Sequence, residues 1–332
     1  MEYAQNEREI VRPNIFSFAT SELSQDAMFA WLVQWADDKY KTLDNPLNQV
    51  AKAFVRLLIG KPENYPIHSI NVGRQWKNID IWVEINDDSF LVIEDKTYTK
   101  IHDDQLDRYK KTAEEEYKGS RPNLFFAYVK TGNEPKATLK CIGGVGYHAV
   151  TRRDILDCLC LYTGKNEILF DFTNHLKQIE NETQSWMMLP VDQWGRYAWE
   201  GFYMELEHRF DRLEWGYVSN PTGGFLGAWW HFVETDDVQM YLQFEESKLC
   251  FKICYEGEED RTDVRWKYHS KLMERAKERY PEILRPNRFG SGMWMTIAIV
   301  SPDDVFGKST IDIDKIDDQL KEYQKLIDEC CK

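Results

Sequence analysis

The sequence predicts an α/β fold in the first half of the chain and an α+β domain in the second. Residues 78–111 have the pattern of strand, turn, strand and helix, and residues 123–129 form a continuous apolar run. Such a run is typical of a strand in a sheet that is covered on both faces. Tryptophans become frequent after residue 185. We therefore expect two domains, at residues 14–184 and 185–332, because 332 residues can hold two domains of ordinary size.

The strand pair within residues 78–111 carries an ordered set of charged residues. Apolar and mostly polar positions alternate from Ile79 to Ile85, which places Asp80 on the opposite face from the isoleucines. A polar turn follows, and the second strand ends in Glu94-Asp95-Lys96. Because side chains alternate along a strand, Glu94 and Lys96 share one face and Asp95 takes the other.

The length of the turn decides whether Asp80 joins Glu94. A two-residue turn at Asp87-Asp88 would put Asp80 on the wrong face, since a one-residue slip turns every side chain over. An odd-length loop, or one bulge, would set Asp80 directly opposite Glu94. We predict the odd loop, which brings two carboxylates together with the ammonium group of Lys96 two residues further on.

Two opposed carboxylates destabilise a strand pair and raise the pKa of one of them, and a divalent cation would remove this conflict. Mg²⁺ prefers carboxylate, carbonyl and phosphate oxygens. We expect Asp80, Glu94 and the backbone carbonyl of Asp95 to bind Mg²⁺ or Mn²⁺. Lys96 would then hold or polarise an attacking water, or steady a phosphate. The alternative is an ordinary charged strand end with a solvated lysine.

The helix after the second strand could complete this site. Gln105 and Tyr109 are four residues apart, so they lie on one helix face. Both have polar groups that could reach a phosphate or a base. In the alternative interpretation, they are a surface residue and a partly buried core residue.

These motifs resemble those of the PD-(D/E)xK nuclease superfamily. The resemblance rests on Ile79-Asp80, Glu94-Asp95-Lys96 and Gln105-Leu106-Asp107-Arg108-Tyr109, and the Gln-Leu-x-x-Tyr helix is similar to the exonuclease-like branch. It covers roughly the first 180 residues, with Ile79 in place of a proline that often varies.

The resemblance implies a restriction-endonuclease-like fold with a mixed central sheet flanked by helices, and a metal-dependent phosphodiesterase acting on DNA. By this resemblance, Asp80 and Glu94 match the metal ligands and Lys96 matches the catalytic lysine. Gln105 and Tyr109 match the helix that lines the substrate side, and they join the expected catalytic set.

A first helix is predicted at Ser24–Ala36, with Thr20 or Ser21 as its cap. Glu22 falls in its first turn, where an acidic side chain favours the helix dipole. The resembled family often places an acidic residue of its first helix near the metal. Glu22 is therefore either a further metal ligand or a helix-end residue, and both alternatives stay open.

Two basic regions are candidates for nucleic-acid contact. Lys130 follows the buried strand, in a region that often lies near the site in the resembled family. A predicted helix at 262–279 carries Arg265, Lys271 and Arg275, with further basic residues at both ends. These side chains could follow a phosphate backbone. The alternatives are a solvated loop lysine and a solvated helix face paired with acidic neighbours.

Composition limits the function classes. The net charge of −14 counts against a general nucleic-acid binder, although a local basic groove stays possible. The seven cysteines contain no C-x-x-C pair, which favours reduced thiols. No apolar run approaches the ~18 residues of a membrane helix, and the N-terminus lacks a secretory pattern. We expect a cytoplasmic protein with no membrane partner.

The sequence therefore predicts a Mg²⁺-dependent nuclease that hydrolyses nucleic acid, with DNA as the implied substrate. Endonuclease and exonuclease action both stay open. The alternative is a catalytically silent nuclease-fold module that docks a protein or nucleic-acid partner. The net charge and the tryptophan-rich second half favour this alternative, whereas the intact Asp80, Glu94 and Lys96 set argues against it.

Overall fold

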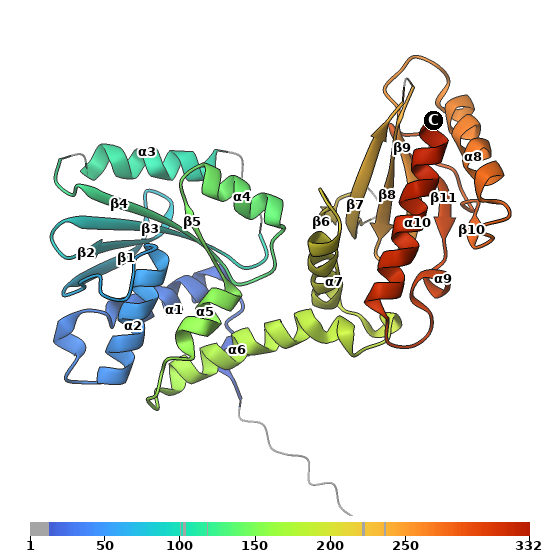
Figure 1. Cartoon of the computed structure of the whole chain (residues 1–332). Helices are drawn as coiled ribbons and strands as arrows, with labels where there is room; N and C mark the ends of the chain where they lie inside the picture. Colours follow the sequence, from blue (N-terminus) through green and yellow to red (C-terminus); the bar gives the residue numbers. More distant parts are fainter. Residues whose placement is uncertain (1–12, 100, 102–103, 118, 221–222, 236) are drawn as a thin grey trace, which may run out of the picture. The chain divides into compact units, whose positions relative to one another are not determined.

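The computed structural model describes residues 13–99, 101, 104–117, 119–220, 223–235 and 237–332 (Figure 1). The chain divides into two compact units. The first contains the chain up to residue 134 together with residues 138–180, and the second contains residues 135–137 and 181–332. Each unit has its own sheet and its own hydrophobic core.

The first unit is built on a five-stranded sheet with the order β1-β2-β3-β4-β5. The first three strands pair antiparallel, whereas β3, β4 and β5 pair parallel. The predicted mixed sheet is therefore confirmed. The strands are β1 (Ile70–Trp76), β2 (Ile79–Ile85), β3 (Ser89–Lys96), β4 (Asn123–Lys130) and β5 (His148–Thr151).

Helices cover both faces of this sheet (Figure 1). On one face lie α1 (Glu22–Gln34), α2 (Asn45–Leu58), α5 (Arg152–Leu159) and α6 (Glu167–Gln184), and on the other lie α3 (Gln105–Tyr117) and α4 (Lys136–Gly144). Coverage of both faces explains why every residue of β3 is buried. The predicted N-cap at Ser21 is confirmed, since its side chain accepts a hydrogen bond from the backbone N–H of Ser24.

The hairpin between β2 and β3 has the register that the sequence predicts. Ile81 pairs with Ile93 and Ile85 pairs with Ser89, which leaves the three-residue loop 86–88. The odd-length loop is therefore confirmed. Ile79 differs from the expected pattern, because it packs in the core on the α3 face rather than with the other apolar residues of β2.

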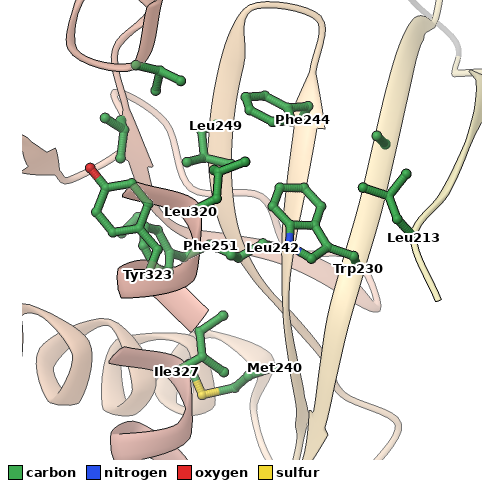
Figure 2. Close-up of a cluster of buried hydrophobic side chains, with 14 of the residues drawn as sticks. Leu213, Trp230, Met240, Leu242, Phe244, Leu249, Phe251, Leu320, Tyr323 and Ile327 are labelled. Carbon is green, nitrogen blue, oxygen red and sulfur yellow. The ribbon is translucent and has the colours of Figure 1, made fainter. Parts of the chain in front are cut away.

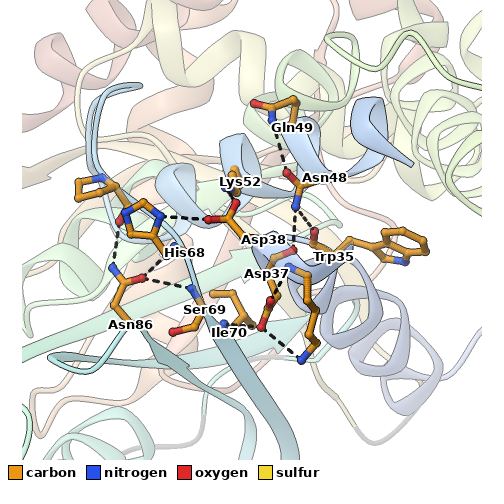
Figure 3. A network of polar contacts seen from close by, with 12 residues as sticks. Trp35, Asp37, Asp38, Asn48, Gln49, Lys52, His68, Ser69, Ile70 and Asn86 are labelled. Atoms are coloured by element: carbon orange, nitrogen blue, oxygen red, sulfur yellow. Dashed lines mark hydrogen bonds and ion pairs between the residues drawn. The ribbon is translucent and has the colours of Figure 1, made fainter. Parts of the chain in front are cut away.

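A polar network fixes the start of β1 and the tip of the hairpin (Figure 3). The side chain of Asn86 accepts from the backbone N–H of His68 at 2.9 Å and donates to the carbonyl of Pro66 at 3.0 Å. The His68 ring and the Lys52 ammonium both contact Asp38. These contacts join the turn after α1, helix α2, the start of β1 and the β2–β3 loop.

The first strand lies later in the chain than the sequence predicts. The sequence predicts the first strand at residues 64–73, where Pro66 is typical of an edge strand or a strand start, but β1 begins at Ile70. Its second half is partly exposed, and Gly73 faces Trp82 so closely that a side chain at Gly73 would collide with the indole. A glycine and exposed polar residues weaken the strand pattern, which explains the error.

The second unit contains a six-stranded antiparallel sheet with the order β10-β11-β9-β8-β7-β6. Its strands are β6 (Glu214–Val218), β7 (Phe225–Glu234), β8 (Gln239–Glu245), β9 (Lys248–Cys254), β10 (Ile283–Leu284) and β11 (Trp294–Val300). Its helices are α7 (Arg196–Arg209), α8 (Arg261–Ala276), α9 (Pro302–Phe306) and α10 (Ile313–Cys331). This arrangement confirms the predicted α+β region.

Aromatic side chains fill the core of the second unit (Figure 2). Trp230, Phe244 and Phe251 come from the sheet, and Tyr323 comes from α10. Many of the tryptophans of this half are buried in the same cluster, so their main role is packing. No helix in the described part of the chain has the length and apolar character needed to cross a membrane.

Candidate metal-binding active site

The ends of β2 and β3 bring Asp80, Glu94 and Lys96 together. The Ile81–Ile93 register, continued by one residue, places Asp80 opposite Glu94. Asp80 Oδ2 lies 3.5 Å from the backbone nitrogen of Asp95 and 3.5 Å from Lys96 Nζ. The cluster of Asp80, Glu94 and Lys96 that the sequence predicts is therefore present in the structure.

Glu94 is fully buried, and its carboxylate is repelled by the charge of Asp80. Its Oε1 accepts a hydrogen bond from Gln105 Nε2 at 2.6 Å and forms an ion pair with Lys96. Among the described residues, Oε2 has no hydrogen-bond partner. Burial, followed by the charge of Asp80, raises the pKa of Glu94 to about 8, although Lys96 opposes the shift.

Lys96 is the cation at the centre of this cluster. Its Nζ contacts Glu94 and Asp80 and donates to the carbonyl of Asp95 at 3.1 Å. Burial disfavours the charged form, but Glu94 and Asp80 outweigh this effect and raise the pKa of Lys96. Lys96 is therefore an ammonium group in this arrangement, suited to donating hydrogen bonds rather than to accepting a proton.

Helix α3 contributes Gln105 and Tyr109, which are both buried. Gln105 Nε2 donates to Glu94 and lies 3.1 Å from the Tyr109 hydroxyl. This contact orients the buried carboxylate of Glu94. Gln105 and Tyr109 are four residues apart and lie on one face of α3, as the sequence predicts, and Gln105 joins this face to Glu94 at the end of β3.

Helix α1 contributes Glu22 from the other face of the sheet. Glu22 Oε1 accepts from the backbone N–H of Thr97 at 3.2 Å and from the Thr99 hydroxyl at 2.6 Å. Burial opposes ionisation, but these hydrogen bonds and the charge of Lys96 lower the pKa of Glu22. In this structure Glu22 holds the segment that follows Lys96.

Asp26, one turn after Glu22, is a candidate residue that the sequence interpretation missed. It is 2% exposed. Its Oδ2 lies 3.5 Å from Gln75 Nε2, whereas Oδ1 has no partner within the described part of the chain. Burial, followed by the charge of Asp80, raises the pKa of Asp26 to about 6. The signal was present in the sequence, because residues four apart share a helix face.

The side chain of Asp95 points away from Glu94 and toward α1, as strand alternation predicts. It is fully buried, and its Oδ1 accepts from Gln25 Nε2 at 2.7 Å. The side-chain oxygen of Gln25, Oε1, accepts from the Thr131 hydroxyl at 2.8 Å. Burial, with the charge of Asp26, raises the pKa of Asp95 well above its ordinary value. This contact fastens α1 to β3 beside the cluster.

A family comparison covers the part of the chain that contains these residues. Residues 13–152 match the PD-(D/E)XK nuclease superfamily. The matched segment contains α1, the β2–β3 hairpin, α3 and β4, so it confirms the resemblance for the N-terminal half. No curated protein and no solved structure matches the chain.

Nucleases of the PD-(D/E)XK superfamily generally use divalent metals, and the donor atoms of this cluster fit such an ion. Glu94 Oε2 and Asp26 Oδ1 are buried oxygens without partners among the described residues. Oxygen donors of this kind suit Mg²⁺ or Mn²⁺. No group of three or more His, Cys, Asp or Glu side chains within the described ranges converges as a preformed metal cage. The Lys96 ammonium instead contacts both Asp80 and Glu94.

Most of the residues predicted to contact nucleic acid make contacts within their own unit. Lys130 is buried, and its Nζ lies 2.8 Å from Glu134 and 3.2 Å from the carbonyl of Thr99. A phosphate contact by Lys130 stays a prediction, as do the basic residues of the second unit.

Those basic residues all belong to α8. Arg265 is buried, stacks on Phe289 at 4.7 Å and donates to the carbonyl of Gly290. Arg275 is half-buried and donates to the carbonyl of Glu329 at 2.9 Å, while Lys271 is half-buried. Two of these three cations therefore serve contacts within the second unit.

Proposed function

We propose that this protein is a metal-dependent phosphodiesterase that hydrolyses DNA, with Mg²⁺ or Mn²⁺ as its cofactor. The observation that carries the proposal is the convergence of Asp80, Glu94 and Lys96 at the end of one hairpin. The match of the same segment to the PD-(D/E)XK nuclease superfamily supports it.

The residues that would hold the cation are Asp80, Glu94 and the carbonyl of Asp95, with Asp26 as a further carboxylate. When bound, the cation supplies charge stabilisation at the phosphate and lowers the pKa of water. We assign the carboxylate ligands on their oxygen chemistry and on the unpartnered oxygens of Glu94 and Asp26.

The remaining residues position and polarise the reacting groups. Lys96, held as an ammonium by its acidic neighbours, would donate hydrogen bonds to the phosphate or to the attacking water and stabilise developing negative charge. Gln105 keeps Glu94 in one orientation. Glu22 restrains the segment at Thr97 and Thr99 that follows the lysine.

The proposal is tested by incubating supercoiled and linear DNA with the purified chain in Mg²⁺, Mn²⁺ or a chelator. Asp80→Asn and Lys96→Gln should each reduce hydrolysis by about 100-fold or more, since each removes a charge at the reacting phosphate. Asp87→Ala, in the exposed hairpin loop, is the matched control and should keep wild-type activity. Wild-type hydrolysis no higher than that of Asp80→Asn would refute the proposal.

A second candidate function is a catalytically silent module that docks a partner. The net charge of −14 favours it, because phosphate binding depends on cationic surfaces. Calorimetry separates the two candidates. Absence of Mn²⁺ binding together with absence of hydrolysis would select the silent module, whereas Mn²⁺ binding that Asp80→Asn abolishes would select the enzyme.

A further inference from the structure

A recess lies along α1, the helix that also carries Asp26. It has a volume of about 450 Å³ and lies between α1, the turn that follows it and the edge strand β1. Its lining includes Trp31, Gln34, Trp35, Tyr40, Gly73 and Arg74. Nothing in the carboxylate site described above uses these side chains.

Three half-buried aromatic rings form one wall of this recess. The Trp31 and Trp35 rings lie 6.2 Å apart in an edge-to-face arrangement, and the Trp35 and Tyr40 rings lie 5.5 Å apart. Arg74 adds a guanidinium group to the lining. Flat apolar surfaces beside a cation suit a flat heterocycle joined to a phosphate.

Two elements that line the recess, α1 and β1, also carry or contact residues of the carboxylate cluster. On α1, Ala30 lines the recess and lies one turn after Asp26, about 6 Å along the helix axis. On the sheet, Arg74 pairs with Ile81, the neighbour of Asp80. Gln75, the next residue of β1, contacts Asp26. These two elements are the route by which a strand bound at the cluster would reach the recess.

We propose that this recess binds an unstacked nucleobase of the strand whose phosphate enters the carboxylate cluster, with Arg74 beside a flanking phosphate. This inference rests on the function proposed above and adds a substrate class to it. Bases in a duplex are paired and stacked, so the recess favours single-stranded DNA or a frayed end. The open edge of β1 could instead take a peptide strand, but the position of Arg74 next to a phosphate-handling cluster favours nucleic acid.

The test measures binding without hydrolysis. The full chain in chelator is titrated into labelled oligothymidine and into a duplex of the same length, with fluorescence anisotropy as the readout. Trp31→Ala should weaken single-strand binding by about tenfold or more, because base stacking on one aromatic ring contributes that much. Trp31→Phe should keep most of the affinity, and duplex binding should change little.

The control is Trp294→Ala, which removes an exposed tryptophan of the second unit, and circular dichroism verifies that each variant is folded. Arg74→Gln, an exposed substitution that leaves the aromatic rings in place, should also weaken single-strand binding. Equal single-strand affinity of wild type, Trp31→Ala and Arg74→Gln overturns the proposal, which is also the result expected if the recess takes a peptide.

Photocrosslinking with a 5-iodouracil oligonucleotide gives an independent readout. Adducts are expected on Trp31, Trp35 or Tyr40, and adducts confined to other residues would reject the recess. Hydrolysis is assayed separately in Mg²⁺. If the enzyme is active but Trp31→Ala leaves its single-strand affinity unchanged, only the proposed role of the recess is refuted. If the chain is inactive but crosslinks at Trp31, only the proposed nuclease activity is refuted.

Discussion

At the scale of single residues, Asp26 is a buried carboxylate with an unpartnered oxygen among the described residues and a charged neighbour in Asp80. Removing its charge should relieve a conflict that only a cation or a proton otherwise resolves. The charge of Asp26 is therefore expected to affect the stability of the fold, the dependence of that stability on pH and the proposed binding of metal.

We predict that Asp26→Asn stabilises the metal-free protein at about pH 8. The pKa of Asp26 rises from an ordinary 3.8 to about 6 on folding. Below the unfolded value the carboxyl is protonated in both states and has no effect on stability. As the pH rises from 3.8 to about 6, the folded state loses stability, and above that range the loss stays constant, on the order of 3 kcal/mol.

Thermal unfolding as a function of pH measures this effect. The Tm of Asp26→Asn should exceed the wild-type Tm by several degrees at about pH 8, with the difference shrinking toward pH 4. Mg²⁺ or Mn²⁺ should raise the wild-type Tm more than the Tm of the variant. A variant that is less stable at about pH 8, with Asp87→Asn unchanged as control, would show that Asp26 has another stabilising partner.

At the scale of elements, the β2–β3 hairpin determines whether the charged residues meet. Its three-residue loop puts Asp80 across from Glu94, and a two-residue loop would separate them to opposite faces. Asn86 lies in this loop with a φ of 50°, a conformation that asparagine tolerates better than most residues. The loop is held to the start of β1 by the same side chain.

We predict that Asn86→Ala destabilises the first unit by about 1–3 kcal/mol. The substitution leaves the backbone N–H of His68 and the carbonyl of Pro66 without their side-chain partner and puts alanine at a positive φ. Chemical denaturation should show a lower midpoint with an unchanged slope. Asp87→Ala, the exposed neighbour in the same loop, should stay within about 0.5 kcal/mol of wild type. Equal stability of the two variants would contradict an anchoring role for Asn86.

At the scale of the whole molecule, the chain consists of two compact units with separate cores. Helix α6 supplies Leu169, Phe172 and Leu176 to the first core, and its residues up to Glu180 belong to the first unit. We keep the domain boundary at residue 184 as a proposal. The residues proposed to bind metal all precede it.

We predict that a fragment of residues 13–184 folds alone and keeps metal-dependent hydrolysis within about tenfold of the full chain, because it contains its own sheet, core and proposed ligands. Circular dichroism and the DNA assay described above measure the two properties, with the same fragment carrying Asp80→Asn as control. A folded but inactive fragment, beside an active full chain, would show that the second unit contributes to the substrate site.

Much of the fold and part of the candidate site could be predicted from the sequence. The alternation from Ile79 to Ile85, the turn residues and the apolar run of β4 are local signals, and each predicts its element. The position of β1 was mispredicted because a glycine inside a strand weakens the local pattern. The reason for Gly73 is the Trp82 ring on the neighbouring strand, a contact that the sequence does not show. Asp26 was missed because its burial and its closeness to Asp80 depend on how α1 crosses the sheet.

Local sequence signals specify the order of the charged residues and the faces on which they lie, because strand period, helix period and turn length are properties of neighbouring residues. Packing between distant elements decided which acidic residue of α1 is buried beside Asp80, and that Lys96 contacts two carboxylates at once. It likewise decided that Lys130 is paired inside the protein. The reason is physical: desolvation and charge–charge interactions depend on distances through space between elements far apart in the chain.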